Sequence, residues 1–272
     1  MTARVDEAKM KGVICFGLLL SWLIPVLAMA QSPFDGTWRV VPGSDQFPAK
    51  PDVYLLQGGI YHCPTCDPPL EIQADGDDHK IAGEPCYDTV SVKVVDDRTT
   101  EEADKKNGKT VRTARMTVAP DGNTATVEWT EMCNAKGDVI TVKKTMDRVT
   151  KGPDGTHAIS GSWHTTKYLN LSENALEATI KLEGDTFYFA DPAGQSYAAK
   201  LDRTETPWKG DLSNTMVSVK RIDRNTVEQT EKRDGKVIKV IRMTVSADRK
   251  TMTWSGGDKA KGTAFQFVAQ KQ

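Results

Sequence analysis

The sequence predicts an all-β protein made of two tandem antiparallel β-barrels that follow a cleaved signal peptide. Three observations support this fold class: an internal repeat, runs of alternating residues rich in Val and Thr, and turn dipeptides between those runs. No segment after residue 30 needs helical spacing to explain it. We expect about eight to ten short strands in each barrel, which is typical of small antiparallel barrels.

The first 30 residues differ in character from the rest of the chain. Lys9 and Lys11 precede the apolar run "GVICFGLLLSWLIPVLAMA", which ends in Ala-Met-Ala before Gln31. This pattern indicates a secretory signal peptide cut after Ala30 and a secreted or periplasmic protein. The alternative is an uncleaved membrane anchor, since about 20 apolar residues span a bilayer. Pro25 and the Ala-Met-Ala end favour cleavage, after which we expect no stable membrane span.

Composition and motifs exclude several functions for the mature chain. The whole chain has a net charge of −1, and the leader's three cationic and two acidic residues contribute +1, which leaves −2 after cleavage. The charges are interspersed, so we expect no nucleic-acid binding. G-x-S-x-G, H-E-x-x-H and P-loop motifs are absent. We therefore expect no enzyme activity, cofactor or metal, and the sequence does not predict an oligomeric state.

A repeat defines the expected domains. Residues 89–126 align without gaps on residues 216–253, at a shift of 127, and 17 of the 38 positions are identical. Further upstream "FDGTW" matches "ISGSW", and "PDGTHA" lies at the joint. We therefore expect a signal peptide over residues 1–30, a cysteine-containing barrel over 31–151 and a cysteine-free barrel over 152–272.

The strongest turn signals are Asn107-Gly108 and its repeat counterpart Asp234-Gly235. Both dipeptides suit a type I′ hairpin turn, in which two residues need positive φ. The strand after the first turn, "TVRTARMTV", alternates between a polar and a more apolar face. We expect the more apolar face to point inward; it carries Arg112, Ala114, Met116 and Val118, and the opposite face carries Val111, Thr113, Arg115 and Thr117.

The four cysteines after the leader all lie in the first module: Cys63, Cys66, Cys86 and Cys133. An even number in an exported chain indicates disulfides, with three possible connectivities. Cys63 and Cys66 are close in sequence, which favours a 63–66 bond and leaves 86–133. The second bond would close about 46 intervening residues and contribute about 4 kcal/mol.

Two alternatives for "CPTC" remain open. A redox centre would place its reactive thiol at a helix N-terminus, whereas Asp67-Pro68-Pro69 disfavours a helix here and the Asp67 charge would raise the thiol pKa. A zinc site could use four Cys, or three with His62, but one C-x-x-C with two scattered cysteines is a weak zinc signal. Structural disulfides are the favoured interpretation.

The pair "GTW" (36–38) and "GSW" (161–163) resembles the Gly-x-Trp start of lipocalins, fatty-acid-binding proteins and other calycin barrels. The resemblance implies that Trp38 and Trp163 each close a barrel end under a basic residue near the last strand. It assigns Arg148 to the first module and Lys271 to the second. The lipocalin Thr-Asp-Tyr motif is absent from both modules.

Nearly the whole mature chain is similar to uncharacterised bacterial secreted proteins with two lipocalin-like β-barrel modules. Stretches such as "YLLQGGIYHCPTCDPP" and "HAISGSWHTTK" carry this resemblance. It implies location and architecture, but the group has no agreed activity to transfer.

These observations favour a non-catalytic exported binding protein that holds a small apolar or amphipathic molecule in one or both barrels. The alternatives are a ligand-free envelope or interaction protein and, more remotely, a thiol–disulfide redox protein using Cys63 and Cys66. Four aromatic residues are candidates for lining a cavity, with core packing as the alternative: Trp129, Phe187, Phe189 and Trp254.

Overall fold

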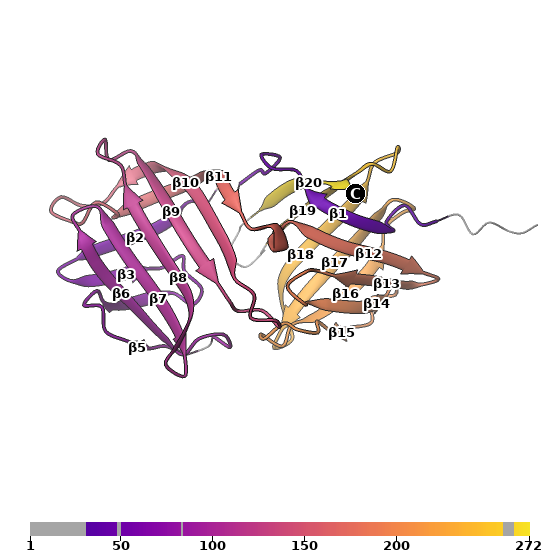
Figure 1. Ribbon diagram of the computed structural model, residues 1–272, viewed down its shortest axis with the longest axis horizontal. Helices are drawn as coiled ribbons and strands as arrows, with labels where there is room; N and C mark the ends of the chain where they lie inside the picture. The colour runs from indigo at the N-terminus through magenta and orange to yellow at the C-terminus, as the bar shows by residue number, and fades with distance from the viewer. Residues whose placement is uncertain (1–30, 48–49, 83, 258–263) are drawn as a thin grey trace, which may run out of the picture. The chain divides into compact units, whose positions relative to one another are not determined.

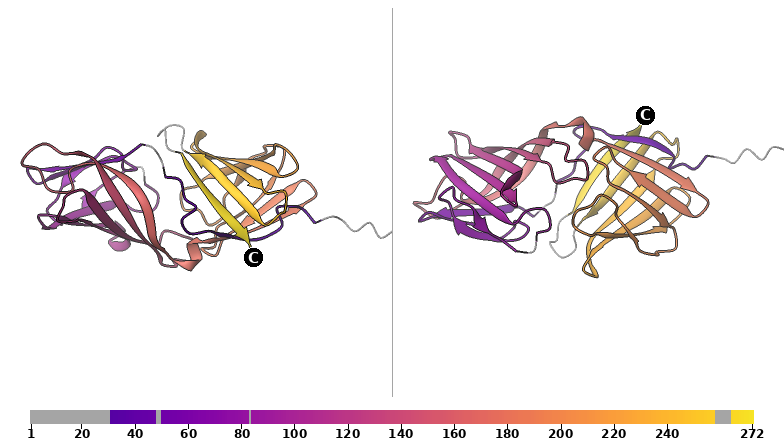
Figure 2. Two further views of the ribbon diagram at one scale, coloured as in Figure 1. Left: turned by 90° about the horizontal axis from the view of Figure 1, so that it is seen from above. Right: turned by 60° about the horizontal axis from the view of Figure 1, so that its bottom comes forward.

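The computed structural model describes residues 31–47, 50–82, 84–257 and 264–272. The chain folds into two ten-stranded antiparallel sheets, each curled into a nearly closed barrel (Figures 1 and 2). This confirms the all-β prediction and the expected number of strands. Within those ranges, the single helical element is the 3₁₀ turn η1, Glu173–Ala175. The predicted signal peptide, with its cleavage after Ala30, lies outside the described residues.

The first barrel has the strand order β4-β3-β2-β11-β10-β9-β8-β7-β6-β5. A bridge between Asp75 and Lys93 links the segment after β4 to β6 and brings the two ends of the sheet together. Its strands are β2 (Asp52–Gln57), β3 (Ile60–Cys63), β4 (Leu70–Gln73), β5 (His79–Lys80), β6 (Thr89–Asp96), β7 (Thr99–Lys106), β8 (Lys109–Val118), β9 (Thr124–Glu131), β10 (Ile140–Lys151) and β11 (Gly161–Leu171).

The second barrel has the corresponding order β14-β13-β12-β1-β20-β19-β18-β17-β16-β15. Bridges from Ser196 to Lys209 and from Asp202 to Lys220 link its two ends. Its strands are β1 (Gly36–Val40), β12 (Glu177–Glu183), β13 (Thr186–Ala190), β14 (Ser196–Lys200), β15 (Thr206–Pro207), β16 (Met216–Arg221), β17 (Thr226–Arg233), β18 (Lys236–Val245), β19 (Thr251–Gly257) and β20 (Phe265–Lys271).

The two barrels exchange their Gly-x-Trp strands relative to the sequence repeat. Strand β1 belongs to the first repeat but pairs with β12 and β20 of the second barrel, as Figure 1 shows. Strand β11 belongs to the second repeat but pairs with β10 and β2 of the first barrel. The boundaries expected from the repeat, 31–151 and 152–272, therefore differ from the sheets, in which the first barrel ends with β11. The physical reason is that the short connection 152–160 lets β11 fold back directly on β10, at little cost in loop-closure entropy.

The predicted hairpin turns are confirmed. Asn107 and Gly108 have φ of 51° and 75°, and Asp234 and Gly235 have φ of 50° and 74°. Positive φ at both central residues is the requirement of a type I′ turn, whose twist matches that of the flanking strands. The same hairpin therefore recurs at the same place in each repeat.

The predicted inward face of β8 is also confirmed, with one correction. Met116 and Val118 are buried, and Arg112 and Ala114 line an interior cavity. Val111, expected on the outer face, instead packs against the core. A bulge opposite the Asp104–Lys105 step interrupts the alternation just before Arg112.

Candidate functional site

One end of the first barrel is closed by Arg148 and Trp163. The guanidinium carbon of Arg148 lies 3.9 Å from the centre of the fully buried Trp163 ring. Its nitrogens donate to the backbone carbonyls of Ala158 and Ser160, each at 2.6 Å, and of Gly122. The Trp163 indole donates to the Ile159 carbonyl at 2.8 Å. Burial lowers the pKa of Arg148.

The second barrel is closed in the same way by Lys271 and Trp38. The Lys271 ammonium lies 5.4 Å from the Trp38 ring centre, and the Trp38 indole donates to the Phe34 carbonyl at 2.7 Å. The structure therefore brings together the expected residue types but exchanges their partners. Arg148 covers Trp163 rather than Trp38, and Lys271 covers Trp38 rather than Trp163, because the Gly-x-Trp strands are exchanged.

The structure pairs the cysteines as expected. Cys63 is bonded to Cys66, with an S–S distance of 2.03 Å, and Cys86 pairs with Cys133, whose Cα atoms are 6.0 Å apart. The first pair ties the end of β3 to the turn before β4. Between these cysteines, Thr65 accepts a hydrogen bond from the amide of Val53 on β2 at 2.9 Å. The "CPTC" segment thus fastens this edge of the first barrel.

The surroundings of Cys63 are those of a structural bond. Cys63 is buried at the end of a strand, and no helix begins near it in the described part of the chain. A helix N-terminus is one of the features that lower a thiol pKa in redox centres. Among those same residues, no group of three or more His, Cys, Asp or Glu side chains is arranged to hold a metal ion.

The inside of the first barrel contains a cavity of about 190 Å³. Its apolar wall comes from Val92, Met116, Val127 and Ile159. Its aromatic and charged wall consists of Tyr54, Tyr61, Glu102, Arg112, Trp129 and Lys144. Trp129 is thus the one of the four aromatic candidates that lines this cavity. The rings of Tyr54 and Tyr61 stack with their centres 6.3 Å apart.

Arg112 is the centre of a buried charge cluster at this cavity. It reaches Glu102 at 3.1 Å, forms a closer ion pair with Asp104, and lies 4.9 Å above the Tyr87 ring. Glu102 and Asp104 come from β7, and Arg112 comes from the facing position of β8. Because alternate residues of a strand share a face, all three side chains point into the barrel.

Carboxyl groups in this cluster are held closer to neutrality than usual. Burial, and secondarily the charge of Glu102, raises the pKa of Asp104 to about 7. Burial also raises the pKa values of Glu102 and of Glu131 on β9. Burial alone would lower the pKa of Arg112, but the charges of Asp104 and Glu102 outweigh it and raise that pKa. The single guanidinium therefore stays charged among three carboxyl groups.

The inside of the second barrel is packed with aromatic side chains. Phe187 is fully buried and Trp254 nearly so. Phe189 contacts both Tyr197, at 5.2 Å between ring centres, and Trp254, at 6.3 Å. The candidates Phe187, Phe189 and Trp254 therefore form part of one core cluster. Phe189 and Trp254 also line a hollow of about 350 Å³, together with Trp38 and Phe267.

Three polar side chains inside the second barrel form a hydrogen-bonded network. At the repeat shift, Gln229 replaces Glu102, Glu231 replaces Asp104 and Lys239 replaces Arg112. The Tyr197 hydroxyl donates to Gln229, whose amide donates to Glu231 at 2.8 Å. Lys239 lies 3.7 Å from Glu231. The two barrels therefore share a backbone plan but have different interiors.

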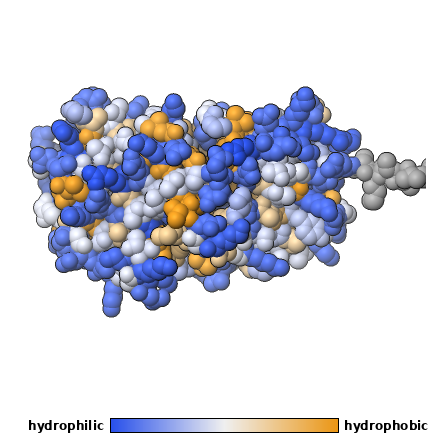
Figure 3. Space-filling view, in the orientation of Figure 1, coloured by the Kyte–Doolittle hydropathy of each residue, from blue (hydrophilic) through white to orange (hydrophobic). Residues whose placement is uncertain are grey.

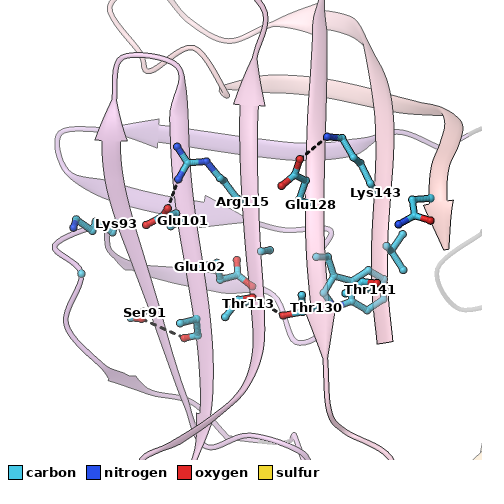
Figure 4. Close-up of a pocket in the computed structure, with 16 residues that line it drawn as sticks. Ser91, Lys93, Glu101, Glu102, Thr113, Arg115, Glu128, Thr130, Thr141 and Lys143 are labelled. Atoms are coloured by element: carbon cyan, nitrogen blue, oxygen red, sulfur yellow. Dashed lines mark hydrogen bonds and ion pairs between the residues drawn. The ribbon is translucent and has the colours of Figure 1, made fainter. Parts of the chain in front are cut away.

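The outer face of the first barrel carries a second hollow, a polar trough of about 690 Å³ across β6 to β11. Figure 4 shows Arg115 reaching Glu101 and Lys143 reaching Glu128 across neighbouring strands, the latter at 2.6 Å. Beside them Thr113 and Thr130 share a hydrogen bond of 2.6 Å. On the molecular face seen in Figure 3, hydrophobic residues form separate patches among hydrophilic ones.

Sequence reasoning did not identify Glu102, Asp104, Tyr54 and Tyr61 as site residues. The usable signal was the inward face of β8: the expectation that Arg112 points inward required buried carboxylates opposite it. The hairpin at Asn107-Gly108 places Glu102 and Asp104 on the facing strand. Their partnership with Tyr54 and Tyr61 required the barrel to close, because these tyrosines come from β2 and β3.

A scan against models of protein families finds no match for this chain, and a search of curated proteins finds no significant relative.

Proposed function

We propose that this chain is a non-catalytic, exported binding protein whose first barrel holds a small amphipathic ligand. One observation carries the proposal: the interior cavity of the first barrel combines apolar and aromatic walls with a few converging polar groups. This combination is typical of small-molecule sites. The second barrel, whose core cluster is rich in aromatic rings, serves in this proposal as a structural partner.

The cavity volume limits the size of the ligand. Sites for drug-sized ligands measure about 300–1,000 Å³, and a cavity of about 150 Å³ accommodates benzene. A space of about 190 Å³ therefore suits a single ring or a short chain with one polar head. The charged and phenolic groups on the wall favour an amphipathic molecule over a purely apolar one.

Export is part of the proposal and rests on the sequence pattern of residues 1–30. The two cysteine pairs agree with it, since disulfides persist in oxidising compartments such as the periplasm. Within the residues that the structure describes, no helix has the length and apolar character needed to cross a bilayer.

Binding can be tested with benzyl alcohol, a neutral amphipathic probe that fits the cavity volume. We expect it to shift the NMR signals of amides on β7 and β8. Ala114→Leu, which fills the cavity from the inner face of β8, should reduce these shifts at least tenfold at equal probe concentration. Ala103→Leu is the matched control, because Ala103 lines the outer trough. Equal binding to both variants, or none to the unmodified protein, would contradict the proposal.

A second candidate function is that of an interaction protein of the cell envelope. The larger outer trough favours it, because its paired charges and hydroxyl groups form a continuous polar surface over six strands. Envelope material retained by immobilised protein, and lost on Lys143→Glu but not on Tyr61→Phe, would support this function over the interior site, because Tyr61 lines the cavity and not the trough.

A further inference from the structure

The cavity of the first barrel contains polar groups that have no hydrogen-bond partner within the described part of the protein. The Tyr61 side chain is 6% exposed and lines the cavity. Among the described residues, its hydroxyl forms no hydrogen bond, and one carboxylate oxygen of Glu102 forms none either, since the other accepts from Arg112. Neither atom is fully enclosed by protein, so both are accessible from the cavity. Accessible polar groups at such a site bond to water or to a bound molecule. A bound molecule with its own polar head would supply these partners.

Charge determines which kind of head fits. Two cations, Arg112 and Lys144, line the cavity. Arg112 is already held by Glu102 and Asp104, and Lys144 lies 3.2 Å from the Thr165 hydroxyl and 3.7 Å from Asp52. Glu102 is the one carboxyl group among the residues that line the cavity. When Asp104, Asp52 and Glu131, which neighbour the two cations, are counted with it, four carboxyl groups surround two cationic groups. These carboxylates would repel a bound anion, whereas they would attract a bound cation.

The aromatic wall has the same preference. The rings of Tyr54 and Tyr61 stack beside each other, and Trp129 completes this side of the cavity. The faces of tyrosine and tryptophan rings carry partial negative charge and attract ammonium groups, most strongly where water is excluded. A carboxylate and aromatic faces on one small wall form a cation-binding environment.

The second barrel has the same strand order but a different residue at the position of Glu102. Gln229 takes the place of Glu102, and its amide oxygen and nitrogen are both used, by Tyr197 and Glu231. Aromatic rings, among them Tyr197 itself, belong to the core cluster around this network. Glu102→Gln therefore gives the first barrel the residue type that the second barrel has at the equivalent position, Gln229.

We propose that the cavity of the first barrel selects a small primary amine, with its ammonium group bonded to Glu102 and Tyr61 and its carbon body among Tyr54 and Trp129. This inference rests on the proposed binding function and specifies the class of ligand. It assigns Glu102 as the residue that determines specificity and Tyr61 as a second polar contact.

Three probes of the same size and different charge test the inference on the intact protein: benzylamine, benzyl alcohol and benzoate, each titrated near neutral pH and followed by NMR. We expect benzylamine to bind at least tenfold more tightly than the other two. Equal binding of the three, or tighter binding of benzoate, would overturn the inference and leave the proposed function standing. Binding of none would contradict both.

Substitutions then locate the selectivity. Glu102→Gln should lower benzylamine binding to the level of benzyl alcohol, because glutamine keeps the shape and an acceptor for Arg112 but removes the charge. Glu101→Gln is the matched control, since Glu101 is the next residue but pairs with Arg115 in the outer trough. Tyr61→Phe keeps the ring and should weaken benzylamine severalfold, and it provides a test if Glu102→Gln does not fold. Unchanged selectivity in Tyr61→Phe and in a folded Glu102→Gln would contradict the assignment.

Discussion

At the scale of single residues, the interior of the first barrel is dominated by one guanidinium among carboxyl groups. Asp104 is fully buried, and its ion-pair partner Arg112 also serves Glu102. Burying an ionised carboxylate is costly unless it is well paired. The cluster therefore reduces the stability of the barrel at neutral pH, which a binding site can tolerate where a purely structural core would gain from apolar residues.

The raised pKa of Asp104 predicts a pH dependence of stability. The folded value of about 7 lies above the ordinary value of 3.8, so the folded state binds the proton more tightly than the unfolded state. This contribution is fully present at pH below 4 and is lost as the pH rises through 7. At about 1.4 kcal/mol per unit, it reaches at most about 4 kcal/mol.

We expect Asp104→Asn to remove most of this dependence. The free energy of unfolding, measured with urea between pH 4.5 and 8, should fall less steeply in the variant than in the unmodified protein. Glu102, Glu131, Arg112 and Tyr87 surround Asp104 and remain in the variant. Asp147→Asn, on the exposed side of β10, is the control and should leave the slope unchanged. An unaltered slope in Asp104→Asn would show that Asp104 does not retain its proton on folding.

At the scale of secondary-structure elements, the Gly-x-Trp strands determine how each barrel closes. Gly161 opens β11 with φ of 129°, and a Cβ atom there would lie 2.2 Å from the Thr150 carbonyl oxygen. Glycine is thus required both for its backbone conformation and for the close approach of β10. This approach brings Trp163 under Arg148.

Gly161→Ala should therefore destabilise the protein by about 3 kcal/mol, from backbone strain and overpacking together. Gly155→Ala is the matched control, because Gly155 also has a positive φ, 77°, but its Cβ would meet nothing within 4 Å. We expect the control to cost about 1 kcal/mol. Equal losses in the two variants, measured by urea unfolding, would argue against the tight contact between β10 and β11.

At the scale of the whole molecule, each barrel borrows one strand from the other repeat. The first barrel is continuous in sequence, from β2 to β11, whereas the second needs β1 from the far N-terminal side. The chain therefore passes between the barrels twice, once after β1 and once after β11. This exchange makes the second barrel depend on residues that precede the first.

Separate expression of segments tests this dependence. We expect residues 50–172 to unfold cooperatively, since they contain every strand of the first sheet. Residues 31–151, the first repeat, should lack this transition because β2 and β10 lose the strand that joins them. Thermal melts followed by circular dichroism compare the two. A cooperative transition in 31–151 together with none in 50–172 would refute the exchanged strand order.

Local patterns in the sequence were sufficient for much of this fold. Alternation on β8 predicted its inward face, and Asn107-Gly108 and Asp234-Gly235 predicted two hairpins, because both features depend on neighbouring residues. The cysteine pairing also followed from proximity and an even count. Where a bulge broke the alternation, at Val111, the prediction was wrong.

By itself, the sequence determined the fold class, the repeat, the turns and the residue types that close each barrel, since these are properties of short segments. Only the tertiary structure decided which Trp lies under which cation, and that Glu102 and Arg112 share a cavity with Tyr54 and Tyr61. Those contacts depend on which strand completes which sheet. Both Gly-x-Trp strands suit either barrel in their sequence pattern, so the lengths of the connecting chain and the packing of the closed sheets make that choice.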